Sequence, residues 1–222
     1  MADNKAFLFD MDGVLADTET EWERIGFDQL LKEHFGDELF AKVEVRGGVS
    51  IKGIFDLYVA AGWSGEYGPY EQKCIEMSER IYGTIPLTEG INELIHYLSD
   101  EGFKIGVVSS SPLPWVKTLV GRIKEKDRIS LILSVNNHPT LRAKPAPDPY
   151  VNAMEQLGVK PEDTFILEDS LTGVTAAKAS GAHVICFTAY HHGYDWQPLP
   201  ENADYYAKDV TEVREIVAKL SS

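Results

Sequence analysis

The sequence is poor in cysteine and has no long apolar run. The 222 residues include two cysteines, Cys74 and Cys186, at a separation that fits no metal-binding spacing. Both stand among apolar neighbours, a pattern typical of buried, reduced thiols. No apolar run approaches the length of a membrane-spanning helix, and no apolar leader precedes the first strand. We therefore expect a soluble, cytoplasmic protein without a membrane partner.

Positive charge is also scarce. Lys and Arg number 21 against 35 Asp and Glu, which gives a formal net charge of -14. A surface with this balance repels nucleic-acid backbones and anionic membranes, so neither is expected as a partner. The sequence leaves the oligomeric state open, with a monomer favoured.

A short apolar run near the start of the chain ends in two aspartates. Residues 6–9 are typical of a buried strand, and Asp10 and Asp12 follow with one Met between them. Alternate residues of a strand point the same way, so both carboxylates begin on one face, and Gly13 then allows a turn. Two carboxylates at the end of a buried strand need a cation, and Mg²⁺ prefers oxygen ligands. A solvated acidic turn is the plainer alternative.

The segment after Asp12 is too long for an ordinary connection and has a helical pattern. Apolar residues recur at helical spacing over residues 18–35, 50–61 and 69–82, and glycines stand at the joints. We therefore predict a helical domain over residues 16–86, inserted into a main domain made of residues 1–15 and 87–222.

The remainder of the chain alternates between strand and helix patterns. The expected strands are residues 104–108, 131–135, 164–167, 183–187 and 205–207, and the expected helices are residues 91–100, 114–124, 149–157, 172–180 and 211–220. This alternation predicts an α/β fold with a parallel sheet covered on both faces. In such sheets, ligands bind at the carboxyl ends of the strands.

Polar residues follow several of these strands. Ser109 and Ser110 follow residues 104–108, Lys144 lies in a proline-rich loop after residues 131–135, and Glu168 and Asp169 follow residues 164–167. Each has a plainer explanation. Ser109 can cap a strand end or a helix, Lys144 can be solvated, and Glu168 with Asp169 can cap the next helix. Together with Asp10 and Asp12, they supply carboxylates for a cation, and hydroxyls, amides and a lysine for an anion.

Four motifs in this order resemble those of the haloacid-dehalogenase superfamily, in its helical-cap subgroup of the phosphoglycolate-phosphatase and β-phosphoglucomutase type. They are Phe9-Asp10-Met11-Asp12-Gly13-Val14, Val107-Val108-Ser109-Ser110-Ser111, Lys144-Pro145-Ala146-Pro147-Asp148 and Leu167-Glu168-Asp169-Ser170-Leu171-Thr172-Gly173. The resemblance implies a Rossmann-like core, an inserted cap that closes over the site, and Mg²⁺-dependent phosphoryl transfer through an aspartyl-phosphate.

The resemblance also implies residue roles, which agree with the chemistry of the side chains. Mg²⁺ is expected to bind the Asp10 carboxylate, the backbone carbonyl of Asp12 and the Asp169 carboxylate, with Glu168 acting through water. Asp10 is the expected nucleophile and Asp12 the expected general acid and base.

The phosphate oxygens are expected to contact the Lys144 ammonium, the Ser109 hydroxyl and the Ser110 backbone amide. Ser109 takes the hydroxyl role because it directly follows the apolar strand.

Two departures from relatives bear on the reaction. Dehalogenases of this superfamily lack the second aspartate, so Asp12 argues against halide chemistry. Mutases of the β-phosphoglucomutase type carry a cap histidine where this sequence has Trp22, which favours a hydrolase. Trp22, Arg46 and Lys52 are candidate substrate contacts in the cap. Core packing is the alternative for Trp22, and a solvated surface is the alternative for the two cations.

The sequence therefore predicts a phosphatase acting on a small phosphorylated metabolite such as a sugar phosphate. A sugar-phosphate mutase is the alternative within the same enzyme family. A signalling receiver phosphorylated on aspartate is a third hypothesis, but the inserted helical domain and Asp12 argue against it.

Overall fold

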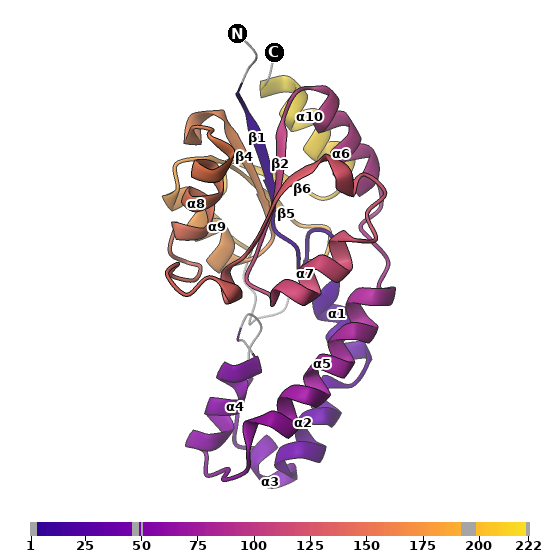
Figure 1. The fold of residues 1–222 in the computed structure, drawn as a ribbon, viewed down its shortest axis with the longest axis vertical. Coiled ribbons are helices and arrows are strands. Elements are labelled where there is room, and N and C mark those ends of the chain that lie inside the picture. Colours follow the sequence, from indigo (N-terminus) through magenta and orange to yellow (C-terminus); the bar gives the residue numbers. More distant parts are fainter. Residues whose placement is uncertain (1–3, 46–48, 50, 192–198, 221–222) are drawn as a thin grey trace. The chain divides into compact units, whose positions relative to one another are not determined.

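The computed structural model describes residues 4–45, 49, 51–191 and 199–220. The chain divides into two compact units (Figure 1). One unit combines Met1–Asp17 with Pro86–Ser222, and the other is Thr18–Ile85. The first boundary therefore follows Asp17 rather than residue 15, and the second precedes Pro86 rather than residue 87.

A six-stranded parallel sheet forms the centre of the larger unit. Its strands lie in the order β3-β2-β1-β4-β5-β6. Their bounds are β1 (Ala6–Phe9), β2 (Lys104–Ser109), β3 (Ile129–Ser134), β4 (Thr164–Glu168), β5 (His183–Phe187) and β6 (Tyr205–Ala207). The predicted α/β fold with a parallel sheet is confirmed.

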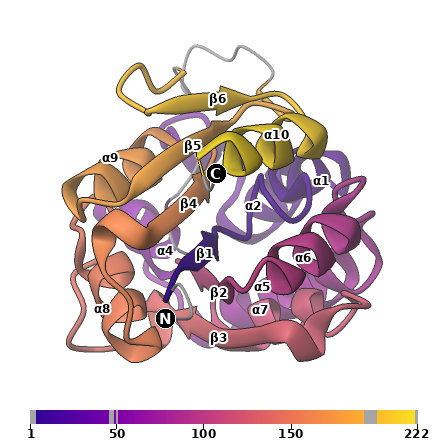
Figure 2. The same cartoon turned by 90° about the horizontal axis from the view of Figure 1, so that it is seen from above.

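Helices cover both faces of this sheet. They are α6 (Ile91–Asp100), α7 (Leu113–Val120), α8 (Asp148–Leu157), α9 (Leu171–Ala179) and α10 (Val210–Leu220), with short 3₁₀ turns at Lys126–Arg128, Val135–Asn137 and Pro161–Asp163. Figure 2 shows α8 and α9 on one face and α6 and α10 on the other. A sheet covered in this way is buried on both sides, which explains why its inner strands are continuous apolar runs.

β1 is the central strand of the larger unit, and its four residues are fully buried. It pairs with β2 on one side and with β4 on the other, so that Phe9 lies opposite both Val107 and Leu167. On the α8 and α9 face, Leu8 packs with Ile166 and with Tyr150 and Met154 of α8. This packing fixes the positions at which β1, β2 and β4 end relative to one another.

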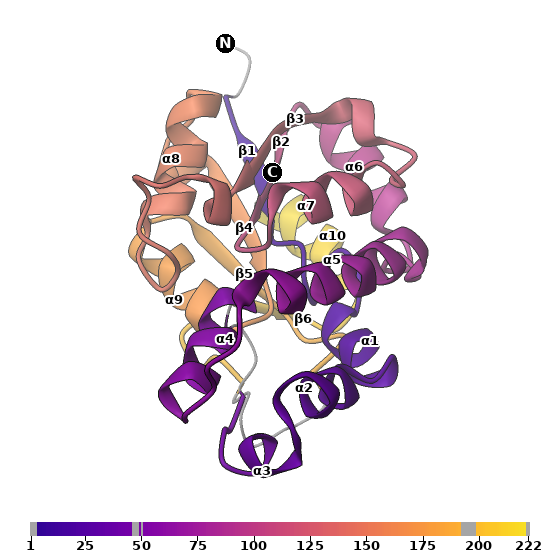
Figure 3. The same cartoon turned by 60° about the horizontal axis from the view of Figure 1, so that its bottom comes forward.

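The smaller unit is helical, as Figure 3 shows in indigo and purple. Its helices are α1 (Thr18–Arg24), α2 (Phe27–Phe35), α3 (Asp37–Phe40), α4 (Ile51–Ala60) and α5 (Tyr67–Thr84). The single helix predicted over residues 18–35 is wrong. Gly26 has a φ of 87°, a left-handed conformation that interrupts the helix and separates α1 from α2.

Aromatic packing forms the core of the helical unit. The rings of Phe35 and Tyr58 stack with centroids 3.8 Å apart and an interplanar angle of 3°, and Tyr70 and Cys74 are buried beside them. None of the helices that the structure describes, in either unit, has the length and apolar character that crossing a membrane requires.

Both cysteines are buried and free, as predicted. Burial raises the pKa of the Cys74 thiol to about 11 and that of Cys186 to about 12, where nearby carboxylates act in the same direction. Thiols with pKa values this high are poor nucleophiles near neutral pH.

Thr88 joins the two segments that connect the larger unit to the helical unit. Its backbone N–H donates to the carbonyl of Leu15 at 2.9 Å, and its hydroxyl donates to the carbonyl of Val14 at 2.6 Å. Tyr190 donates to the Thr88 hydroxyl at 3.1 Å. The outgoing and returning segments are therefore fixed beside each other within the larger unit.

Candidate active site

The candidate site lies where β1, β2 and β4 end. The backbone N–H of Asp10 continues the sheet by donating to the carbonyl of Leu167 at 3.0 Å. Because the strands are parallel and in register, Asp10, Ser109 and Glu168 come to the same edge of the sheet. This is the edge at which α/β sheets bind ligands.

Lys144 lies within this group of strand-end residues, in the loop between β3 and α8. Its ammonium donates to Asp10 Oδ1 at 2.5 Å, to Glu168 Oε1 at 2.6 Å and to the carbonyl of Val108 at 3.2 Å. Its side chain is only 6% exposed. A buried ammonium needs compensation of this kind, and the two carboxylates supply it.

The charges in this cluster shift one another's protonation. Burial raises the pKa of Asp10 to about 8, against the opposing effect of Lys144 and with further increases from Glu168 and Asp12. Burial disfavours the charge on Lys144, but the negative charges of Asp10 and Glu168 outweigh it and raise the Lys144 pKa well above its usual value. A cation bound beside Asp10 would lower this pKa and favour the ionised carboxylate.

Glu168 is fully buried, and both of its carboxylate oxygens accept hydrogen bonds. Oε1 accepts from Lys144 and from the hydroxyl of Tyr150 at 2.7 Å. Oε2 accepts from the backbone N–H groups of Asp169 and Ser170 at 3.1 and 3.3 Å, and from the Ser170 hydroxyl at 3.2 Å. Glu168 thus fixes the start of α9.

The N-cap of α9 is Ser170, whose hydroxyl accepts from the backbone N–H of Gly173 at 3.0 Å. The alternative in which Glu168 and Asp169 cap this helix is therefore wrong. Glu168 instead accepts from the backbone N–H groups of Asp169 and Ser170, which precede the helix.

Two glycines make room for two of the carboxylates. A Cβ on Gly13 would lie 2.0 Å from Asp169 Oδ2, and a Cβ on Gly173 would lie 1.9 Å from Glu168 Oε1. Gly13 also has a φ of 75°, which other residues rarely adopt. The acidic side chains therefore occupy space that a larger residue at either position would fill.

Three carboxylates in the described part of the chain lie close enough to hold one cation. Asp10, Glu168 and Asp169 each offer an oxygen atom within 4.8 Å of the others. Hard divalent cations such as Mg²⁺ and Ca²⁺ bind sites made of carboxylate oxygens, so this donor set fits Mg²⁺. The Asp12 carboxylate lies outside the set.

The three serines after Val108 have different surroundings. Ser109 is fully buried, and its hydroxyl accepts from the Ser111 backbone N–H at 3.0 Å. Ser110 is exposed. Ser111 donates its hydroxyl to Asp12 Oδ2 at 2.7 Å and accepts from Ser134 through its carbonyl at 2.7 Å. The structure thus connects Asp12 to the β2 loop through Ser111.

Sequence reasoning missed Tyr150, Ser111 and Ser170. Tyr150 places a hydroxyl on the otherwise apolar buried face of α8. A buried tyrosine hydroxyl usually has a hydrogen-bond partner, so the sequence pattern indicates a polar contact at this position. Ser111 stands in the second motif, but its distant partner Asp12 could not be read from spacing.

The candidate substrate contacts of the helical unit have neighbours within that unit. Trp22 contacts the rings of Phe27 and Tyr82 edge-on. Lys52 forms an ion pair with Asp56 and lies 5.4 Å from the centroid of the Tyr67 ring. Arg46 falls outside the described residues.

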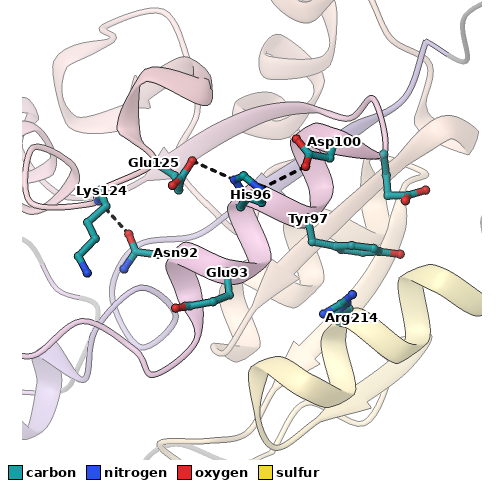
Figure 4. A pocket seen from close by; sticks show the side chains of 9 residues that line it. Asn92, Glu93, His96, Tyr97, Asp100, Lys124, Glu125 and Arg214 are labelled. Carbon is teal, nitrogen blue, oxygen red and sulfur yellow. Dashed lines mark hydrogen bonds and ion pairs between the residues drawn. The ribbon is translucent and has the colours of Figure 1, made fainter.

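A cavity of about 610 Å³ lies elsewhere in the larger unit, between α6 and α10 (Figure 4). The Arg214 guanidinium lies over the ring of Tyr97, 4.4 Å from its centroid. Nε2 of His96 lies 3.2 Å from Asp100 Oδ2, and Nδ1 of the same ring lies 3.4 Å from Glu125 Oε2. No predicted site residue lines this cavity.

Known proteins match the chain in both sequence and fold. A family model described as haloacid dehalogenase-like hydrolase matches residues 7–187. Hexitol phosphatase B of Escherichia coli K12 is 30% identical over 183 residues, covering 79% of each chain. Validoxylamine A 7'-phosphate phosphatase of Streptomyces hygroscopicus subsp. limoneus is 28% identical over 221 residues, covering 95% of this chain and 96% of that protein. The crystal structure of CbbY from Rhodobacter sphaeroides in complex with phosphate has a TM-score of 0.69, 27% identity and 96% coverage of both chains.

Proposed function

Since the chain belongs to the haloacid dehalogenase-like hydrolase family, we propose that it is a Mg²⁺-dependent phosphatase acting on a small phosphorylated metabolite. The substrate class is a sugar phosphate or a related polyol phosphate, and the reaction passes through an aspartyl-phosphate on Asp10. Relatives named hexitol phosphatase B and validoxylamine A 7'-phosphate phosphatase support this class.

The observation that carries the proposal is the buried Lys144, bonded to Asp10 and Glu168 beside the carboxylate of Asp169. A phosphate monoester dianion resists attack by an anionic carboxylate. A lysine ammonium and a carboxylate-bound cation at one strand edge are what such a reaction requires.

The side chains account for both half-reactions. Asp10 attacks phosphorus in line, so that a bond from its carboxylate oxygen to phosphorus forms while the ester bond breaks. Asp12 gives its proton to the departing alkoxide. It then takes a proton from the water that attacks the aspartyl-phosphate, which releases inorganic phosphate and restores Asp10.

Lys144, the Ser109 hydroxyl and the Ser110 backbone amide hold the phosphate oxygens as charge shifts between them. Asp10, Asp169 and the backbone carbonyl of Asp12 would hold Mg²⁺, with Glu168 supporting it through water. When bound, Mg²⁺ offsets the negative charge of the phosphate and keeps Asp10 ionised.

We assign substrate selection to the helical unit, which the chain inserts directly after the β1 motif. Trp22, Lys52 and Arg46 are its candidate contacts. The ion pair between Lys52 and Asp56 and the ring contacts of Trp22 also fit a purely local role. Replacement of each by Ala, assayed for KM, separates the two roles.

The test is release of inorganic phosphate from a panel of sugar, polyol and nucleotide monophosphates in the presence of Mg²⁺. We expect linear release from sugar or polyol phosphates that stops with EDTA and is lost in Asp10→Asn. Asp163→Asn is the matched control, because Asp163 is exposed and precedes the start of β4, whereas the cluster lies where β4 ends. No release from any ester on the panel would refute the proposal.

A mutase of the β-phosphoglucomutase type would give a different product pattern. With a bisphosphate primer present, an isomerised sugar phosphate would form faster than free phosphate. We expect free phosphate to dominate, because Trp22 stands where such mutases carry a histidine.

A further inference from the structure

Tyr150 contacts both charged partners at the centre of the candidate site. Its hydroxyl donates to Glu168 Oε1 at 2.7 Å, and the Lys144 ammonium lies 4.9 Å from the centroid of its ring. The side chain is fully buried in the first turn of α8, within the apolar cluster that includes Leu8 and Ile166. The position of Tyr150 is therefore set by the packing of α8 on the sheet.

The hydroxyl of Tyr150 changes how Lys144 is shared. Glu168 Oε1 accepts hydrogen bonds from two donors, Lys144 and Tyr150. The Lys144 ammonium also donates to Asp10 and to the carbonyl of Val108. Without the hydroxyl, Lys144 would be the one donor left to this oxygen among the described contacts. A buried carboxylate lacking a donor is costly, so Lys144 would move toward Glu168 and away from Asp10.

The ring of Tyr150 has a separate effect. An aromatic face attracts a nearby cation, and Lys144 has little contact with water to compete with that attraction. The ring therefore restricts where the ammonium can lie, while the hydroxyl fixes the carboxylate that it faces.

We propose that Tyr150 is a positioning residue, which orients Glu168 through its hydroxyl and confines Lys144 through its ring, so that the cation site and the phosphate-binding ammonium form together. This inference rests on the proposed phosphatase function. Tyr150 touches neither substrate nor metal in this scheme. It acts through Glu168 and Lys144.

The test compares Tyr150→Phe with Tyr150→Leu. The first removes the hydroxyl and keeps the ring, and the second removes both. Tyr58→Phe is the matched control, because Tyr58 is equally buried and its hydroxyl has no hydrogen-bond partner among the described residues. The measurements are Mg²⁺ affinity by calorimetry, the rise in Tm that Mg²⁺ produces, and kcat and KM for the best phosphate ester.

We expect Tyr150→Phe to bind Mg²⁺ about ten-fold more weakly and to lose about ten-fold in kcat, as changes to groups that orient metal ligands commonly do. Its KM should change less than its kcat, because the substrate's organic part is not contacted. Tyr150→Leu should lose more than Tyr150→Phe, and Tyr58→Phe should bind Mg²⁺ as the wild type does.

A purely structural role would lower the Tm of Tyr150→Phe while leaving its Mg²⁺ affinity and kcat at wild-type values, and that result would overturn the inference. Failure of the proposed function has a different signature. In that case the wild type would release phosphate from no ester, while the Mg²⁺ affinities of the variants would still decide the role of Tyr150.

Discussion

Ser109 and Ser110 are adjacent, yet the structure gives them opposite environments. Ser109 ends β2 with its hydroxyl buried at the site edge, whereas Ser110 is exposed. The proposed mechanism uses the hydroxyl of the first residue and the backbone amide of the second. Replacement of the two side chains therefore separates the two contributions.

We predict that Ser109→Ala lowers kcat/KM by at least about ten-fold, because a buried hydroxyl that contacts a charged phosphate contributes roughly 1.5–3 kcal/mol. Ser110→Ala should lower it much less, because alanine keeps the backbone amide. The measurement is steady-state phosphate release by the two variants. A larger loss in Ser110→Ala would show that the hydroxyl role belongs one residue later.

The raised pKa of Asp10 predicts how Mg²⁺ binding depends on pH. In metal-free protein the pKa of Asp10 is about 8, so Mg²⁺ must displace a proton below that pH. We expect Mg²⁺ affinity to increase from about pH 6 to about pH 8 and then to level off. Calorimetry at a series of pH values measures this, and Asp10→Asn should lose the dependence.

The same group also affects stability. A folded-state pKa above the unfolded value means that the native protein binds more protons, so the contribution of Asp10 to stability is fully present below about pH 4 and is lost as pH rises toward about 8. The rise in Tm produced by Mg²⁺ should therefore be larger at pH 8 than at pH 6. An equal rise at both values would contradict the assignment of Asp10 as a metal ligand.

At the scale of elements, the first turn of α9 is tightly packed against the site. Gly173 leaves the space that the Glu168 carboxylate occupies, and Ser170 caps the helix beside it. Helix α9 begins at Leu171, and the two residues just before it, Asp169 and Ser170, donate to the Glu168 carboxylate. A change in this turn acts directly on the cluster.

We predict that Gly173→Ala displaces Glu168 and reduces Mg²⁺ affinity by at least about ten-fold, although alanine is normally the better helix former. Gly83→Ala is the matched control, because Gly83 lies in α5 with no atom within 4 Å of the added Cβ. That variant should be unchanged or more stable by up to about 1 kcal/mol. Equal Mg²⁺ affinities for the two variants would exclude the proposed crowding.

Most residues of the candidate site follow strands that the apolar pattern of the sequence predicts. Residues 164–167 and 104–108 are short apolar runs, which indicate strands, and the edge-binding rule for parallel sheets then predicts Glu168 near Asp10. The site roles of these residues remain predictions. The family resemblance drawn from the four motifs is confirmed by the match to residues 7–187.

Other features depend on tertiary contacts that no local pattern encodes. The contact of Tyr150 with Glu168 needs the packing of α8 on the sheet, and the bond from Ser111 to Asp12 joins residues 99 apart in the chain. The break at Gly26 was missed because apolar spacing continues across it, while the conformation of one glycine decides where the helix stops.

At the scale of the whole molecule, net charge affects the encounter with substrate. The chain carries a formal charge of -14, and a phosphate monoester is an anion near neutral pH. Long-range repulsion of this kind slows association, and salt screens it over about 8–10 Å at physiological ionic strength. The buried Lys144 acts only at close range.

We therefore predict that kcat/KM at fixed, saturating Mg²⁺ increases as KCl is raised from about 20 mM to about 150 mM, by a factor of roughly two. The measurement is initial-rate kinetics below KM. The control is a phosphate monoester with an ammonium group on its organic part, which should respond less because its net negative charge is smaller. A decrease with salt would mean that a local positive potential governs the encounter.

The hydrogen bonds of Thr88 have a consequence for how this chain could be rebuilt. Because Thr88 binds both Val14 and Leu15, the chain leaves the larger unit and returns to it at one point. Closing a loop between neighbouring ends costs little conformational entropy. Since the strands of the sheet, β1 to β6, lie outside Thr18–Ile85, we expect a short linker of glycines and serines to replace the helical unit without interrupting the sheet.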